Sequence, residues 1–171
     1  MKNKVYVYFI DYDELYIEEL LLGLINPSKY IISTFNSSSD FFSNYNEKAH
    51  KFNSIHIVFL SSNIELDKKE NQIDVNKIVR KIKKMNSNIE IILYSENDDI
   101  NKVSEAFYNG VYSFIKKNEN IFLRIENNII SIISEKMFIY KKRNSKFYTI
   151  LFFAFSILLV IIFIIKYFFL S

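Results

Sequence analysis

The 171 residues are half apolar and include no cysteine. That length fits one ordinary domain with an additional segment, and the composition excludes a disordered chain, disulfides and zinc–thiolate sites. The formal net charge of +3 comes from one end, because five basic residues and no acidic ones follow Tyr140. The 17 basic and 19 acidic residues of 1–140 give that part a net charge of −2, so it lacks the overall positive charge typical of nucleic-acid-binding domains.

The first third of the chain predicts two strands and two helices. Val5–Ile10 is a short apolar strand, and Asp13 is placed to cap a helix from Glu14 to about Ile25, because aspartate accepts the free N–H groups of a first turn. Tyr30–Phe35 is rich in β-branched and aromatic residues, as strands are. Asp40–Lys48 predicts a short helix with its aromatic residues on one side.

The stretch His56–Asn63, HIVFLSSN, predicts the central strand. A continuous apolar run of this length is typical of a strand buried on both faces of a parallel sheet. We expect His56 to be a core histidine within it. In open α/β sheets the functional crevice lies beyond the carboxyl ends of the strands, so Ser61, Ser62 and Asn63 should face it.

The second half of the soluble part alternates helices and strands. We expect a helix over Asp74–Met85, a strand over Ile89–Tyr94 and a helix over Asp98–Tyr108 with Val103, Ala106 and Phe107 directed inward. Gly110 fits the C-cap of that last helix, since glycine adopts the left-handed conformation at little cost.

The elements that follow complete a regular alternation. Val111–Lys116 is a short fifth strand, and Asn120–Tyr140 is one long amphipathic helix. Five strands alternating with five helices through short loops indicate an α/β domain with a parallel five-stranded sheet, right-handed crossovers and helices on both faces.

The C-terminal stretch from Phe147 to Ile165 is 19 residues long and carries no charge. A helix of that length spans about 28 Å, close to the roughly 30 Å hydrocarbon thickness of a bilayer. A buried core helix is the alternative, but a chain this short could not cover such an apolar rod on all sides. We predict a basic juxtamembrane segment over 139–146 and a transmembrane helix over 147–168.

The charges beside this span predict its orientation. Lys141, Lys142, Arg143 and Lys146 precede it, and Lys166 alone follows. The positive-inside rule then places the N-terminal domain in the cytoplasm. We expect a single-pass protein of a bacterial inner membrane that contacts membrane lipid through this helix.

Three motifs, in this order, resemble one known family. They are YFIDYDELY at 8–16, IVFL-S at 57–61, and the stretch 91–117, which holds the strand ending in Ser95, Gly110 and the aromatic-x-x-lysine that ends at Lys117. Together they resemble the CheY-like receiver domains of two-component response regulators. The resemblance spans about residues 4–136, implies a flavodoxin-like (βα)5 doubly wound fold, and leads us to assign 1–138 to a receiver-like domain.

The resemblance implies a set of site residues. In the family, acidic side chains hold Mg²⁺, an aspartate is phosphorylated, a hydroxyl and a lysine contact the phosphoryl group, and an aromatic residue switches rotamer. By position the corresponding residues here are Asp11 and Asp13 for the metal, Tyr12 where a second acid is usual, Ser61 at the phosphoacceptor, Ser95 for the hydroxyl, Phe114 for the aromatic and Lys117 for the lysine. Asn118 replaces the usual proline after the lysine, so we expect no cis peptide bond there.

Ser61 is the substitution with the largest chemical consequence. Formation of an acyl phosphate requires a carboxylate nucleophile beside a divalent cation, and a serine hydroxyl is a poor Mg²⁺ ligand. We therefore expect no catalytic residue and no cofactor, with Mg²⁺ binding weak or absent and Asp11 and Asp13 its only candidate ligands. Asp67 lies too far into the following loop to substitute as acceptor.

The same residues also have purely structural interpretations. Asp13 can be a helix cap, Lys117 can pair with Asp11, and Ser95 can bond its own loop backbone. His50 fits a surface loop. Neither histidine has a partner at a spacing typical of metal sites.

We therefore predict a degenerate receiver, or pseudo-receiver, that is not an enzyme and is anchored between Phe147 and Ile165. It would act as a signalling adaptor for a kinase, a regulator or a second receiver-like copy, with no nucleic acid and no small-molecule substrate. The face formed by the fourth helix, fifth strand and fifth helix is its candidate interface. The alternatives are a structural subunit of an inner-membrane secretion or motility machine, and an active phosphoreceiver with an atypical site.

Overall fold

The computed structural model describes residues 4–45, 54–62, 74–96, 100–118 and 120–170. The chain divides into two compact units, residues 1–133 and residues 134–171. Asn63, Asp67 and His50, for which the sequence supports expectations, lie outside the described residues.

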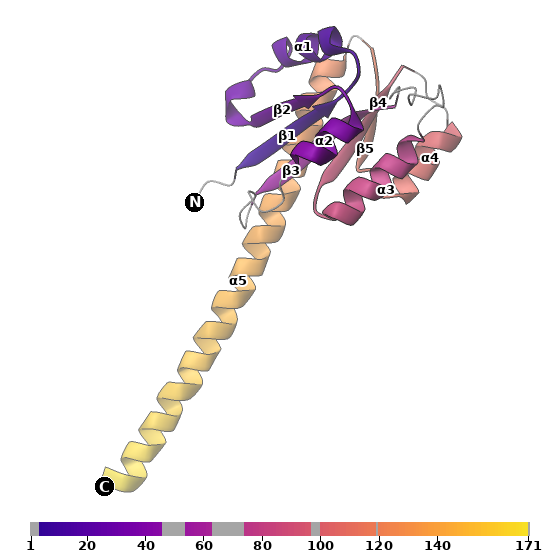
Figure 1. Cartoon of the computed structure of the whole chain (residues 1–171). Helices are drawn as coiled ribbons and strands as arrows, with labels where there is room; N and C mark the ends of the chain where they lie inside the picture. Colours follow the sequence, from indigo (N-terminus) through magenta and orange to yellow (C-terminus); the bar gives the residue numbers. More distant parts are fainter. Residues whose placement is uncertain (1–3, 46–53, 63–73, 97–99, 119, 171) are drawn as a thin grey trace. The chain divides into compact units, whose positions relative to one another are not determined.

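The first unit is built on one sheet of five parallel strands in the order β2-β1-β3-β4-β5 (Figure 1). This order confirms the predicted flavodoxin-like, doubly wound topology. The strands are β1 (Val5–Ile10), β2 (Ile31–Phe35), β3 (Ile55–Ser61), β4 (Glu90–Ser95) and β5 (Ser113–Lys116).

The helices follow the strands as the alternation predicts. Their bounds are α1 (Glu14–Leu22), the 3₁₀ turn η1 (Pro27–Lys29), α2 (Ser38–Asn44), α3 (Val75–Met85), α4 (Ile100–Tyr108) and α5 (Ile121–Leu170). Asp13 caps α1 as predicted, since its side chain accepts from the Tyr16 N–H at 3.0 Å. Gly110 has a φ of 97° after α4, which is the left-handed conformation expected of the cap.

Two helix boundaries differ from the predictions. Helix α1 ends at Leu22 and not near Ile25, with Gly23 at its C-cap, and the chain then turns into Pro27. Gly23 packs so closely on the Phe122 ring that a Cβ atom there would lie 2.1 Å from it. Helix α2 begins before Asp40, because the Ser37 hydroxyl accepts from the Asp40 N–H at 3.0 Å and caps it earlier.

The core lies on both sides of the sheet. On one side, residues of α2, α3 and α4 pack with alternate residues of β1, β3 and β4. On the other side lie the stacked rings of Phe9 and Phe59, 4.9 Å apart, with buried residues of α1 and of the first turns of α5. Every residue of β3 is buried, as predicted for the central strand of a parallel sheet.

The inward prediction for Phe107 is wrong. Ala106 is fully buried and fills the inward position of α4, whereas 46% of Phe107 and 93% of Tyr108 are exposed. The inward prediction for Ala106 is therefore confirmed, and Phe107, the next residue around the helix, points away from the sheet.

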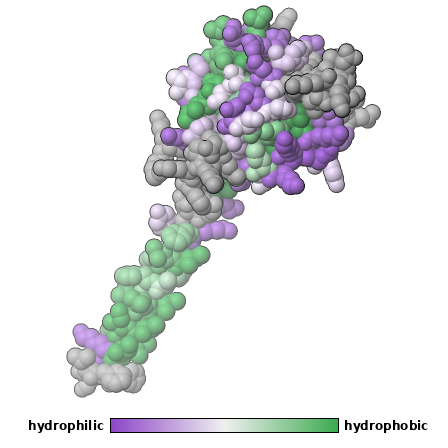
Figure 2. All heavy atoms as spheres, viewed as in Figure 1, coloured by the Kyte–Doolittle hydropathy of each residue, from purple (hydrophilic) through white to green (hydrophobic). Residues whose placement is uncertain are grey.

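Helix α5 is continuous from Ile121 to Leu170 and therefore runs from the first unit into the second. It is the one described helix that is long and apolar enough to cross a membrane, and none of its most apolar window is buried. Figure 2 shows hydrophobic side chains along this segment. Phe147 and Ile165, the predicted ends of the anchor, are both exposed.

Candidate functional site

The carboxyl ends of β1, β3, β4 and β5 lie side by side, and the row that these strand ends form is called the carboxyl edge of the sheet. Ile10 is in register with Leu60, Ser61 with Tyr94, and Ser95 with Lys116. The residues just beyond these positions are therefore neighbours, as the parallel topology predicts. Backbone bonds hold the edge together, since the Ser62 N–H donates to the Tyr94 carbonyl at 2.9 Å and the Lys117 N–H donates to the Ser95 carbonyl at 2.7 Å.

At the centre of this edge, Asp11 and Lys117 form a shielded ion pair. The Lys117 Nζ atom donates to Asp11 Oδ2 at 3.2 Å, with the carboxylate completely buried and the lysine side chain only 11% exposed. The other carboxylate oxygen, Oδ1, accepts from the Asp13 N–H at 3.3 Å. Removing one partner from such a pair would leave an uncompensated charge in the interior.

Two aromatic rings enclose the same lysine. Lys117 Nζ lies 4.0 Å from the centroid of the Tyr16 ring and 5.2 Å from that of Tyr94. A cation over an aromatic face is attracted by the ring's electron density. These contacts could not be predicted from the sequence, because the rings come from α1 and β4, far from Lys117 in the chain.

The Asp11 carboxylate also affects the pKa values of Tyr16 and Tyr94. Burial, followed by the negative charge of Asp11, raises the pKa of Tyr16 to about 12. Burial is also the main cause that raises the pKa of Tyr94 well above 10, with Asp11 again second. The Tyr94 hydroxyl has no hydrogen bond within 3.5 Å among the described residues, so its interaction with Asp11 is electrostatic and at longer range. Both phenols are therefore neutral donors at physiological pH.

Ser61 occupies the end of β3, where the resemblance places the phosphoacceptor. Its side chain is fully buried, and its hydroxyl has no hydrogen-bond partner in the part of the chain that the structure describes. A buried hydroxyl without a partner can accept or donate to water but cannot act as an anionic nucleophile without a base.

The carboxylates at this edge do not fit a Mg²⁺ site. Asp11 is already neutralised by Lys117, Asp13 is exposed and caps α1, and Tyr12 presents a 57% exposed ring instead of a second acid. No group of three or more acidic, histidine or cysteine side chains could hold a metal within residues 4–45, 54–62, 74–96, 100–118 and 120–170. Magnesium prefers several oxygen ligands, at least one or two of them anionic.

Ser95 and Phe114 complete the predicted set. Ser95 is buried at the end of β4, and its backbone carbonyl accepts from the Lys117 N–H. Phe114 is half-buried in β5 and packs against the core on the α2–α4 side of the sheet. The structure therefore places all seven predicted residues at or next to one edge.

His56 lies away from this edge and is buried in β3 as a core histidine. Its Nδ1 atom is 3.3 Å from the Tyr8 hydroxyl, and its Nε2 atom is 2.8 Å from the Ser54 hydroxyl. Its ring stacks on Tyr6 with centroids 5.0 Å apart. These contacts satisfy both ring nitrogens, as expected for a structural histidine.

Sequence reasoning missed an apolar surface on α1 and β2. Leu22 is 88% exposed, and Leu15, Ile25 and Ile31 are exposed nearby. A groove of about 590 Å³ separates the two elements; it is lined by Glu18, Leu21, Leu22, Pro27, Ile32, Ser33 and Thr34. Strand β2 ends the sheet, so its outer edge has no pairing strand among the described residues. The signal was present in the sequence, because α1 has leucine or isoleucine on every side.

No protein-family model matches the sequence, and no curated protein matches it. Solved structures of receiver domains do match the fold. The signal receiver domain of an HD domain-containing protein from Pseudomonas fluorescens Pf-5 superimposes with a TM-score of 0.59 at 12% identity, covering 79% of this chain and 98% of that one. A CheY-like response regulator receiver domain protein from Methanospirillum hungatei JF-1 gives 0.58 at 10%, with 78% and 99% covered.

A third example is full-length FixJ from B. japonicum, with a TM-score of 0.60 at 18% identity, covering 79% of this chain and 60% of that one. These likenesses confirm that the N-terminal unit has the receiver-domain fold that the three motifs predicted. They extend over nearly the whole of the two isolated domains and over 79% and 78% of this chain.

Proposed function

We propose that this protein is a membrane-tethered pseudo-receiver that acts by binding other proteins and not by accepting a phosphoryl group. The observation that carries this proposal is the Asp11–Lys117 pair beside Ser61. In the family that the fold resembles, a carboxylate at the end of β3 accepts the phosphoryl group, and here a neutral hydroxyl occupies that position.

The pair also argues against a phosphorylation switch. The lysine that would contact a phosphoryl group is already bound to Asp11 and covered by Tyr16. Recruiting it would require breaking a shielded ion pair, and no second cation among the described residues pairs with the buried Asp11 carboxylate. The edge is therefore held in one state, with no Mg²⁺ needed to neutralise clustered acids.

The C-terminal helix supports the tether. Its apolar span lacks any charge between Phe147 and Ile165, and basic residues precede it. Thr149 and Ser156 satisfy their hydroxyls within the helix, donating to the carbonyls of Ser145 and Phe152 at 3.0 and 2.9 Å. The span therefore needs no partner helix for its polar groups, which favours a simple anchor over a subunit packed into a membrane machine.

Two exposed apolar surfaces support binding of proteins. The first is the α1–β2 groove with Leu15, Leu22 and Ile31, and the second is the end of α4 with Phe107 and Tyr108. The second lies on the α4–β5–α5 face that receivers use for pairing. Contiguous exposed apolar side chains on a soluble domain mark interaction sites, because their hydration is unfavourable.

Site-specific photo-cross-linking in cells tests the proposal. A photoreactive residue at Leu22 or at Tyr108 should capture a discrete protein, whereas one at the exposed position Glu135 of α5 serves as the matched control. Replacing 147–165 with an unrelated apolar span should leave these products unchanged. A stoichiometric complex that forms only with the native span would instead identify a machine subunit, and cross-links equal at all three positions would contradict a specific adaptor.

A further inference from the structure

Helix α3 carries a row of cations on its exposed face. Its apolar residues face the sheet, while the exposed basic positions, spaced i, i+3, i+4 and i+7, are Lys77, Arg80, Lys81 and Lys84. No acidic residue lies within α3. Figure 2 shows hydrophilic side chains gathered over this helix. Such a spacing aligns all four charges along one side of the helix.

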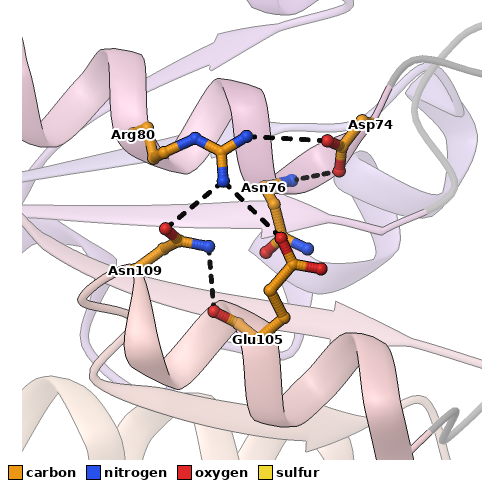
Figure 3. Close-up of polar contacts among 5 residues, drawn as sticks. All are labelled: Asp74, Asn76, Arg80, Glu105 and Asn109. Carbon is orange, nitrogen blue, oxygen red and sulfur yellow. Dashed lines mark hydrogen bonds and ion pairs between the residues drawn. The ribbon is translucent and has the colours of Figure 1, made fainter.

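Part of this charge is already neutralised. Figure 3 shows Arg80 between Asp74 at 3.7 Å and Glu105 at 3.6 Å, with Asn109 Oδ1 at 3.4 Å. This contact clamps the start of α3 to α4. Lys83, on the flank of the row, pairs with Glu90 at 3.5 Å. These ion pairs fix the position of the helix and leave the rest of the row available.

Three lysines of the row remain unpaired. Lys77, Lys81 and Lys84 have no acidic side chain within 4 Å in the described part of the chain, and the Lys81 ammonium lies 3.9 Å above the Phe42 ring. Helix α1, on the opposite face of the sheet, carries Glu14, Glu18 and Glu19 and no basic residue. Helices α3 and α1 therefore carry opposite charges on opposite faces of the sheet.

We propose that this α3 face, with Lys77, Lys81 and Lys84, docks on the anionic headgroups of the membrane that holds the C-terminal helix. The inference rests on the proposed tether, which is what brings lipid to the domain. Charge complementarity selects the occupant: a phospholipid surface is extended, anionic and matched to a row of lysines, and it repels the acidic α1 face. Docking would therefore turn the α1–β2 groove toward the cytoplasm, where a protein partner can reach it.

Because the C-terminal helix would hold the domain at the membrane, weak contacts with lipid are sufficient to orient the domain. Each lysine near an anionic leaflet adds a modest attraction, and three together favour the docked orientation by roughly a hundredfold. Anchoring makes docking intramolecular, so no entropy of bringing two free bodies together opposes it. Because α5 is one continuous helix from Ile121 to Leu170, docking requires this helix to bend within residues 134–146.

The test uses the whole chain in nanodiscs of phosphatidylcholine alone or of phosphatidylcholine with phosphatidylglycerol. Because the native chain has no cysteine, a single Ser87→Cys at the exposed end of α3 and a single Ser28→Cys on the α1 side each take one fluorophore. We expect a headgroup-attached quencher to quench the Ser87 label strongly only in anionic discs, and the Ser28 label weakly in both.

Charge reversal gives the matched comparison. Lys77→Glu, Lys81→Glu and Lys84→Glu together should abolish the quenching at Ser87, whereas Lys4→Glu, Lys29→Glu and Arg124→Glu, which change the net charge equally elsewhere, should preserve it. Near-ultraviolet circular dichroism checks that both triple variants fold. Equal quenching in the two lipids, or equal loss in the two triple variants, overturns the proposal.

Two further outcomes separate the alternatives. A chain that fails to co-elute with nanodiscs contradicts the tether itself, and the docking fails with it; a chain that co-elutes without quenching contradicts only the docking. Binding of a fluorescent DNA duplex that the α3 reversal removes, without quenching by lipid, would assign the basic row to nucleic acid and overturn the lipid proposal.

Discussion

Strand β3 and the C-terminal part of α5 are both uncharged and mostly apolar, yet their surroundings differ. Each residue of β3 is buried by strands on both sides and helices on both faces. The 18-residue window of the span has no buried residue. Burial in the first case is supplied by the protein, and in the second we propose that it is supplied by lipid. The length of an apolar run therefore distinguishes a buried strand from a helix long enough to span a membrane.

Replacing a side chain in each run should give the clearest contrast. Phe59→Ala removes a fully buried ring from β3 and should lower the free energy of unfolding by about 3–5 kcal/mol, through lost burial and a cavity. Leu159→Ala changes an exposed residue of the span and should leave the domain's stability unchanged. Urea unfolding in detergent, followed by near-ultraviolet circular dichroism of the tyrosines, measures both. A loss for Leu159→Ala equal to that for Phe59→Ala would contradict the division into two units.

The ion pair at the end of β1 should be almost as costly to break. Asp11→Asn leaves Lys117 shielded and unpaired and should destabilise the domain by about 3–5 kcal/mol. The double variant Asp11→Asn with Lys117→Met, which removes both charges, should recover most of that loss. The same unfolding assay completes a double-mutant cycle. A double variant no more stable than Asp11→Asn would mean that the pair is not the source of the effect.

Much of this comparison could be predicted from the sequence, because it depends on local patterns. The apolar run of β3, the cap at Asp13 and the glycine at 110 each identify themselves within a few residues. The surroundings of Lys117 could not be predicted in the same way. Tyr16 and Tyr94 reach it only because α1 and β4 are folded against β5, and the sequence offers no periodicity for such a contact. The exposed leucines of α1 were visible in the sequence, but their lack of cover became evident only in the fold.

A charge in the middle of the span should weaken its insertion. Leu159→Arg places a cation near the bilayer centre at a cost of about 2.5–3.5 kcal/mol. Leu22→Arg, on the exposed surface of α1, is the matched control and should insert normally. Flotation of membranes on a density gradient compares the two proteins. Equal flotation of both variants would show that the helix does not hold the chain in the membrane.

The smallest expected effect concerns alkaline pH. Tyr16 has its pKa raised from 10 to about 12 in the folded state, so the unfolded chain loses this proton first and stability should fall as pH rises above 10. Tyr16→Phe should reduce that slope by at most about 1.4 kcal/mol per pH unit, and Tyr12→Phe, at an exposed ring, should not. Urea midpoints measured from pH 9 to pH 11.5 give both slopes. Identical slopes in the two variants would contradict the raised pKa of Tyr16.

The most direct measurement of the central claim is phosphoryl transfer to the whole chain. The protein in nanodiscs is mixed with acetyl phosphate and Mg²⁺ beside an active receiver domain as the positive control, and intact mass spectrometry follows both. With Ser61 at the end of β3 and Lys117 bound to Asp11, the account predicts that the control gains a phosphoryl group and this chain does not. A Mg²⁺-dependent, stoichiometric phosphoryl group on Asp11 or on any other residue of the domain would contradict it.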